Sequence, residues 1–154
     1  STAVFKFIVL GTQVLNESSP HERLGQFPKE RQKIFDFIRE NKISGVLFLT
    51  GDIHHTVLMK SNDLCDYPVY DFTCSPLTSV VHNAHSYEYE NSLVVKDKIA
   101  ITHNFGKINV TGKENERKCI IEAYNEKGEK LWDYVIEQKE LAPTQPSPPN
   151  GGRE

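Results

Sequence analysis

The segment that decides the fold reads Val46-Leu47-Phe48-Leu49-Thr50-Gly51-Asp52-Ile53-His54-His55. Its first five residues are apolar or β-branched, which is typical of a strand buried on both faces. Polar side chains follow at once, and Gly51 permits a sharp turn or a close approach to a ligand. Because ligand sites in open α/β sheets form beyond the carboxyl ends of strands, Asp52 and His54 are candidate site residues.

A second apolar run upstream, at residues 4–10, has the same pattern and is also predicted to be a strand buried on both faces. Pro28 is suited to the first position of a helix, which we predict to continue over residues 29–41. The apolar stripe of this helix comprises Ile34, Phe35, Phe37 and Ile38. Strand, helix and strand together form a βαβ unit, which predicts two parallel strands with a right-handed crossover.

Downstream of the quoted segment the pattern changes to short β-type runs separated by turn signals. The predicted strands are residues 57–60, 69–74, 99–103, 107–110, 119–124 and 131–137. The last two flank the turn at residues 125–128 and are predicted to form an antiparallel hairpin. The expected fold class is therefore α/β at the start and mostly antiparallel β at the end.

Composition excludes several functional classes. The 154 residues are 38% hydrophobic and 25% charged, which is an ordinary globular balance. The net charge of -3 leaves no excess of Lys and Arg for a polyphosphate, so nucleic acid is not an expected partner. No run approaches the roughly 18 apolar residues that a membrane span requires. The three cysteines form no CxxC pair and are predicted to be free.

The two ends of the chain suggest its organisation. Ser1 is followed at once by a candidate core strand, so we expect the chain to be part of a longer protein. Residues 141–154 contain four prolines and two glycines with little to bury, and we predict a disordered tail or linker there. Residues 1–140 are left as the folded unit.

The loop after the central strand carries the residues best suited to chemistry. Asp52 and His54 are two residues apart, so an extended loop could aim a carboxylate and an imidazole the same way. An oxygen and a nitrogen donor together suit Zn, Mn or Fe, whereas the plainer interpretation is a loop Asp that caps backbone amides. His55 adds a second imidazole. His82 and His85 lie in a Ser/Tyr/Asn-rich stretch and are interpreted as solvated loop histidines.

Four blocks of the sequence, taken in order, resemble the alkaline phosphatase D (PhoD-like) family of the metallophosphoesterase superfamily. They are Gly11-Thr12-Gln13-Val14-Leu15-Asn16, Gln26-Phe27-Pro28-Lys29-Glu30-Arg31, residues 44–55 and residues 67–79. Asn104-Phe105-Gly106 and the closing hairpin extend the resemblance to about Glu137. It implies the C-terminal half of a metallophosphoesterase-type β-sandwich flanked by helices, a fold that holds two or more metal ions.

The resemblance also implies roles for individual residues. Asp52 and His54 correspond to the last metal-binding motif of the superfamily and are expected ligands of Fe, Zn, Mn or Ca. Gln13 falls where another ligand is common and is expected to contact metal or substrate. Two roles are open for His103. It could lie near the site and support the metal ligands, or it could be a structural residue at a strand end. His55 is the candidate to protonate the leaving oxygen. It could equally support the metal ligands without contacting the substrate.

The expected reaction is hydrolysis of a phosphate monoester or diester by a metal-bridged hydroxide, with this chain supplying one wall of the site. The first ligand motifs of the superfamily are not found in this sequence. We therefore expect the N-terminal half of the same domain, as a separate or cleaved chain, to be the partner, and this piece not to be stable alone. The resemblance further implies export to the periplasm, cell surface or extracellular space. The alternatives are a non-catalytic metallophosphoesterase-like binding protein and, further off, a β-rich adhesion module.

Overall fold

The computed structural model describes residues 1–20 and 23–143 of the chain. The predicted tail at residues 141–154 therefore lies almost wholly outside the described residues. In chain order the elements are β1 (Lys6–Val9), η1 (Leu24–Gln26), α1 (Pro28–Glu40), β2 (Val46–Thr50), β3 (Thr56–Ser61), β4 (Val69–Thr73), α2 (Ser86–Tyr89), β5 (Val94–Ala100), β6 (Asn104–Thr111), β7 (Lys118–Asn125), β8 (Lys130–Glu137) and η2 (Gln138–Leu141).

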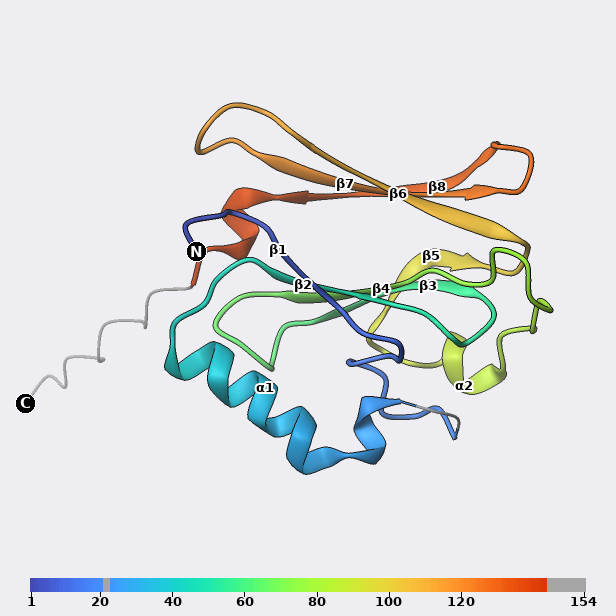
Figure 1. The fold of residues 1–154 in the computed structure, drawn as a ribbon, viewed down its shortest axis with the longest axis horizontal. Helices are drawn as coiled ribbons and strands as arrows, with labels where there is room; N and C mark the ends of the chain where they lie inside the picture. Colours follow the sequence, from blue (N-terminus) through green and yellow to red (C-terminus); the bar gives the residue numbers. More distant parts are fainter. Residues whose placement is uncertain (21–22, 144–154) are drawn as a thin grey trace, which may run out of the picture.

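The strands form two sheets that face each other (Figure 1). The larger sheet has the order β1-β2-β4-β3-β5, and the smaller sheet has the order β6-β7-β8. β1, β2 and β4 run parallel, whereas every other pairing is antiparallel. Helix α1 covers the outer face of the larger sheet, and the smaller sheet covers its inner face (Figure 1). This two-sheet α/β arrangement confirms the expected fold class.

Helix α1 begins at Pro28 as predicted, but its buried stripe is narrower than predicted. Phe35 and Ile38 are buried, and the Phe35 ring packs edge-on against Phe48 of β2 at 5.9 Å between centroids. Phe37, predicted to face the core, is 60% exposed. With 3.6 residues per turn, Phe37 lies about 200° around the helix from Phe35 and so faces away from the sheet.

The prediction that residues 4–10 form a strand buried on both faces is wrong. β1 is four residues long, and its side chains alternate, with Phe7 37% exposed and Val9 73% exposed. The physical reason is its position, because β1 is an edge strand that pairs only with β2. Central strand β4, by contrast, is buried at every position, as expected of a strand covered on both faces.

The strand predictions in the second half differ in accuracy. Residues 57–60, 69–74, 119–124 and 131–137 correspond to β3, β4, β7 and β8, and the last two strands form the predicted antiparallel hairpin. β6 is longer than the predicted 107–110. The predicted strand at 99–103 is wrong, because β5 is Val94–Ala100. Its centre is Lys96-Asp97-Lys98, and this edge strand tolerates exposed polar residues that hide its apolar pattern.

The two sheets approach each other closely at Gly106 of β6. A Cβ atom added to Gly106 would lie 2.6 Å from the ring of Phe72 in β4, which is closer than van der Waals contact permits. The same Phe72 ring packs edge-on against Trp132 of β8 at 5.7 Å between centroids. Gly106 is therefore needed here for the close approach of strand and ring.

The three cysteines are free, as predicted. Among residues 1–20 and 23–143, no helix has the length and apolar character needed to cross a bilayer.

Candidate functional site

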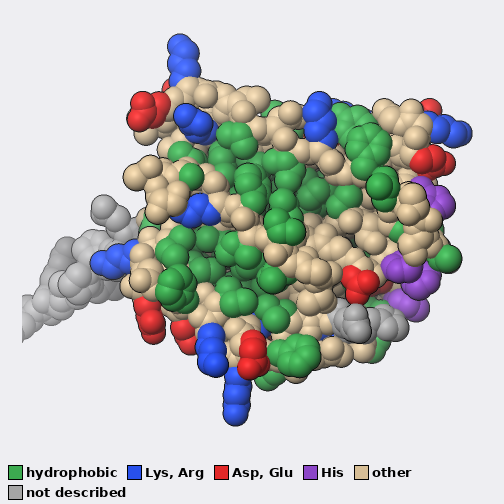
Figure 2. All heavy atoms as spheres, viewed as in Figure 1, with side chains coloured by type: hydrophobic (Ala, Val, Ile, Leu, Met, Phe, Trp, Pro, Cys, Tyr) green, Lys and Arg blue, Asp and Glu red, His purple; other side chains and the backbone are tan. Residues whose placement is uncertain are grey.

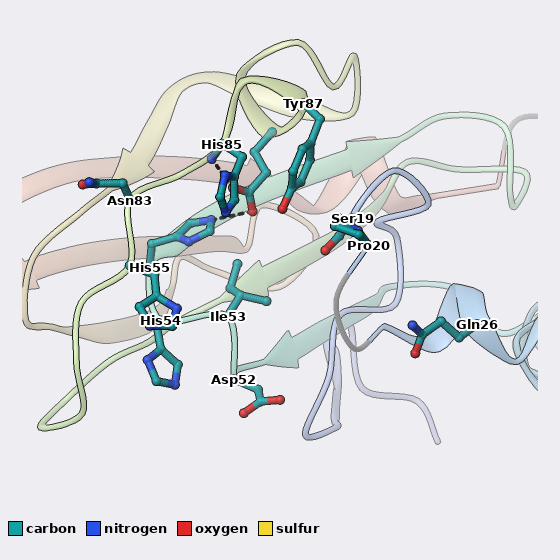
Figure 3. Close-up of a pocket in the computed structure, with 12 residues that line it drawn as sticks. Ser19, Pro20, Gln26, Asp52, Ile53, His54, His55, Asn83, His85 and Tyr87 are labelled. Carbon is teal, nitrogen blue, oxygen red and sulfur yellow. Dashed lines mark hydrogen bonds and ion pairs between the residues drawn. The ribbon is translucent and has the colours of Figure 1, made fainter.

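A pocket of about 390 Å³ lies beyond the carboxyl ends of the parallel strands, where the loops after β1, β2 and β4 meet (Figure 3). The β2–β3 loop contributes four consecutive residues, Asp52 to His55. The segment that leads into α2, together with α2 itself, contributes His82, Asn83, His85, Tyr87 and Glu88. The loop after β1 contributes Ser19, Pro20 and Gln26. The pocket lies at the edge of the sheet where the candidate site residues Asp52 and His54 are predicted.

The backbone of the β2–β3 loop is left-handed at both candidate ligands. Asp52 has φ 76° and His54 has φ 61°. The loop is therefore not extended at these residues, in contrast to the extended loop considered from the sequence. Residues other than glycine seldom adopt this region, although Asp and His do so more often than most. The turn is held by the His54 N–H, which donates to Ser75 Oγ at 3.2 Å, and by the His82 N–H, which donates to the His54 carbonyl at 3.0 Å. Backbone strain of this kind collects at functional sites.

The His54 ring has one nitrogen occupied and one available. Nδ1 lies 2.6 Å from the carbonyl oxygen of Val80, and a carbonyl can only accept, so Nδ1 must carry the proton. The Nε2 lone pair is consequently left for another partner. Metal-binding histidines usually donate their second ring nitrogen to a carbonyl or carboxylate in this way. The ring also stacks on His82 at 4.4 Å between centroids.

The Asp52 carboxylate is exposed and makes no hydrogen bond or ion pair with any residue that the structure describes. Together with Nε2 of His54 it offers two donors suited to a divalent cation. Within residues 1–20 and 23–143, however, no three His, Cys, Asp or Glu side chains converge to hold a metal ion. The donors present fit one wall of a metal site and do not form a complete one.

His55 lies deeper than its neighbour, with 3% of its surface exposed. Its Nε2 atom is 2.9 Å from Oε1 of Glu88, a residue that is also 3% exposed. The second oxygen of Glu88 accepts the His85 backbone N–H at 2.7 Å. Burial alone would raise the pKa of the Glu88 carboxyl, but the His55 imidazole and the His85 N–H outweigh it and lower that pKa.

Sequence reasoning missed Glu88. The available signal was the spacing His85-Ser86-Tyr87-Glu88, in which a Glu follows three residues after a residue that caps a helix. A capping box is normally recognised by Ser or Thr at its first position, and here that position is His85.

Gln13 and His103, the other two predicted site residues, do not line the pocket. Gln13 is fully buried behind it, where its Nε2 donates to Thr73 Oγ1 at 3.0 Å and its Oε1 accepts from Asn16 at 2.8 Å. His103 Nε2 lies 2.9 Å from the carbonyl oxygen of Ser79. The structure thus places Asp52, His54 and His55 in the lining of one pocket, and Gln13 and His103 outside that lining.

A buried carboxylate in β4 ties the loop after β1 to the sheet. Oδ2 of Asp71 accepts the backbone N–H groups of Val14 at 2.7 Å and Leu15 at 2.9 Å. Its Oδ1 accepts the Thr50 hydroxyl at 2.6 Å. Burial raises the pKa of the Asp71 carboxyl, while these three hydrogen bonds oppose the rise. Asp71 was not predicted, because in the sequence it sits inside an apolar strand.

The sequence model of the family described as PhoD-like phosphatase matches residues 10–120. The chain is also similar to a solved structure, "Structure of PhoD", with a TM-score of 0.55 and 14% sequence identity. The match covers 99% of this chain and 34% of that one, so the chain spans about a third of the length of the protein it resembles. No curated protein matches the chain. At this identity the structural likeness establishes the fold alone.

Proposed function

Because this chain belongs to the PhoD-like phosphatase family, we propose that it forms one wall of the active site of a metal-dependent phosphate ester hydrolase. The observation that carries the proposal is the state of the two donors in the β2–β3 loop. Nδ1 of His54 is bonded to the Val80 carbonyl, which leaves Nε2 available in the same loop as the Asp52 carboxylate, for which no partner exists among the described residues. Bound metal ions, such as Fe, Zn, Mn or Ca, would polarise the phosphoryl group and activate a water molecule.

Asp52 and His54 would hold the metal from one side, in a loop whose backbone is fixed before any metal arrives. His55, the next residue of the same loop, would present its second ring nitrogen to the ester and, with both ring nitrogens protonated, supply the proton that the leaving oxygen needs. The substrate would be a phosphate monoester or diester, and the protein would act outside the cytoplasm.

We further propose that the other metal ligands come from the part of a PhoD-like fold that has no counterpart in this chain. Two observations support this arrangement. The solved PhoD structure is about three times as long as the matched chain, and the edge of β1 exposes Phe7 and Val9. Figure 2 shows hydrophobic side chains spread over the face on which β1 lies. A further strand along β1 would cover these side chains and complete the sheet.

The proposal of metal-dependent hydrolysis is tested with the Asp52→Asn variant of the intact protein. We expect hydrolysis of an aryl phosphate to fall by about 1,000-fold and the bound metal to fall with it, since a carboxamide is a poor ligand for these ions. Asp63→Asn is the matched control, because Asp63 is an exposed loop residue outside the pocket. Wild-type turnover with unchanged metal content in Asp52→Asn would remove the proposal. Bound metal without any turnover in the wild-type protein would favour a non-catalytic binding protein.

The covering of the β1 edge is tested in the intact protein. We expect Phe7→Ser to destabilise it by about 2 kcal/mol, because a phenyl ring covered by the neighbouring strand is lost. Phe37→Ser is the control, since Phe37 is exposed on α1. An effect of Phe7→Ser no larger than that of Phe37→Ser, measured by urea unfolding, would show that nothing covers this edge.

A further inference from the structure

Glu88 is a buried carboxylate beside the pocket that the proposed chemistry has not used. Its two oxygens serve different donors, His55 Nε2 at 2.9 Å and the His85 backbone N–H at 2.7 Å. One carboxylate therefore joins the β2–β3 loop to the start of α2. Glu90 lies two residues along the chain and is exposed, so burial of a carboxylate is not a general property of this segment. Figure 3 shows His55 beside His85 and Tyr87 at one side of the pocket.

The contact determines which way the His55 ring faces. An ionised carboxylate can only accept, so the His55 nitrogen next to Glu88 carries its proton toward that carboxylate. The other nitrogen, Nδ1, is then left on the far side of the ring. Neither ring nitrogen makes a hydrogen bond of good geometry among the described residues, but Nε2 has the Glu88 carboxylate 2.9 Å away, whereas Nδ1 is buried with no partner there, although His55 lines the pocket. A buried ring nitrogen without a partner is rare in proteins and indicates that something else binds it.

We propose that Glu88 is a positioning residue, which holds His55 so that its Nδ1 side faces the bound phosphate ester. This inference rests on the proposed function for the identity of the ligand, but the orientation of the ring does not depend on it. The rival interpretation is that Glu88 only caps α2 through the His85 N–H. The two differ in what they predict for the His55 ring.

The substitution Glu88→Gln separates these interpretations, because a carboxamide accepts at one end and donates at the other. Both neighbours can be satisfied only if its oxygen takes the His85 N–H and its NH₂ group donates to His55 Nε2. His55 Nε2 must then lose its proton, and the ring carries the proton on Nδ1. We therefore expect Glu88→Gln to exchange the protonated and unprotonated nitrogens of His55.

The measurement is ¹⁵N NMR of the intact protein labelled in histidine only, in which ring nitrogens with and without hydrogen have different shifts. We expect a proton on His55 Nε2 in the wild type and on Nδ1 in Glu88→Gln. Glu90→Gln is the matched control and should leave His55 as in the wild type. The His54 ring is an internal reference, since its Nδ1 should stay protonated in all three proteins.

Catalysis gives the second readout. In Glu88→Gln we expect kcat to fall by about 10- to 100-fold, as is typical when a group that orients a site residue is lost, with KM changed about twofold or less. The proposal is wrong if His55 Nε2 carries no proton in the wild-type protein. This outcome can be observed whether or not the Glu88→Gln variant folds. An unchanged His55 ring or an unchanged kcat in a folded Glu88→Gln variant overturns it as well. The expected NMR exchange in a protein without phosphatase activity would instead sink the proposed function and leave the orienting role standing.

Discussion

The pocket end of the larger sheet and the interface between the two sheets are held together by different means. At the pocket end, the left-handed backbone at His54 is fixed by hydrogen bonds, and the buried carboxylate of Asp71 holds the loop after β1. At the interface, Gly106 lets the backbone of β6 approach the ring of Phe72, and apolar contacts provide the cohesion. Hydrogen bonds fix the orientation of the groups that they join, whereas close apolar packing fixes the distance between the sheets. A site whose donor atoms must point at a ligand therefore requires hydrogen bonds.

The largest expected effect on stability is at Asp71. Asp71→Ala leaves the backbone N–H groups of Val14 and Leu15 buried without an acceptor, and we expect it to lower the free energy of unfolding by about 3 kcal/mol or more. Asp71→Asn retains one acceptor oxygen and should be about half as damaging. The measurement is urea unfolding, with Asp63→Ala as the control. Equal stability of the wild type and Asp71→Ala would mean that the polar network does not hold the pocket end together.

A smaller loss is expected at the interface. The Cβ of Gly106→Ala would meet Phe72, and we expect a destabilisation of about 2 kcal/mol from overpacking. In a Phe72→Leu background the added methyl group should be tolerated better, which gives a coupling energy of about 1 kcal/mol in a double-mutant cycle. Gly11→Ala is the control, because a Cβ there meets nothing within 4 Å. Strictly additive effects of the two substitutions would show that this contact does not set the distance between the sheets.

The strain at the pocket end predicts a difference of about 1 kcal/mol between two variants of one residue. Because Asp52 has a positive φ, Asp52→Gly should be more stable than Asp52→Ala by about that amount. At Asp63, whose φ is not positive, the order should be reversed, since glycine there only adds freedom to the unfolded chain. Thermal or urea unfolding of the four variants tests this. If the alanine variant is more stable than the glycine variant at both positions, the loop is not strained at Asp52.

The smallest effect is the dependence on pH. The pKa of Glu88 is lowered in the folded state, so this carboxylate stabilises the fold above its ordinary pKa of about 4.5 and loses that contribution as the pH falls through the lowered value. Glu88→Gln should therefore lose less of its Tm between pH 5 and pH 3 than the wild type does. Glu90→Gln serves as the control and should follow the wild type. The same acid sensitivity in Glu88→Gln would show that the carboxylate makes no such contribution.

The sequence predicted those features whose cause is local. β2 is a continuous apolar run that ends at Gly51, so its burial and the position of Asp52 and His54 at a cleft follow from neighbouring residues. The βαβ unit and the final hairpin are local in the same sense. The family resemblance added the expected chemistry of the loop.

The features that could not be predicted depend on which segments meet in space. β1 has the composition of a central strand, but its neighbours in the sheet leave Phe7 and Val9 exposed. Glu88 becomes informative only when α2 is placed beside His55. Likewise, Asp71 becomes important because the loop after β1 folds over it, which no feature within β4 indicates.

The exposed edge of β1 has a practical consequence for handling this chain. A strand with free backbone N–H and C=O groups beside Phe7 and Val9 is a template on which another molecule can add its own strand. A preparation of the chain without a cover for that edge should therefore form aggregates more readily as its concentration rises. A lysine in place of Val9, as natural edge strands use for protection, should keep the isolated chain monodisperse.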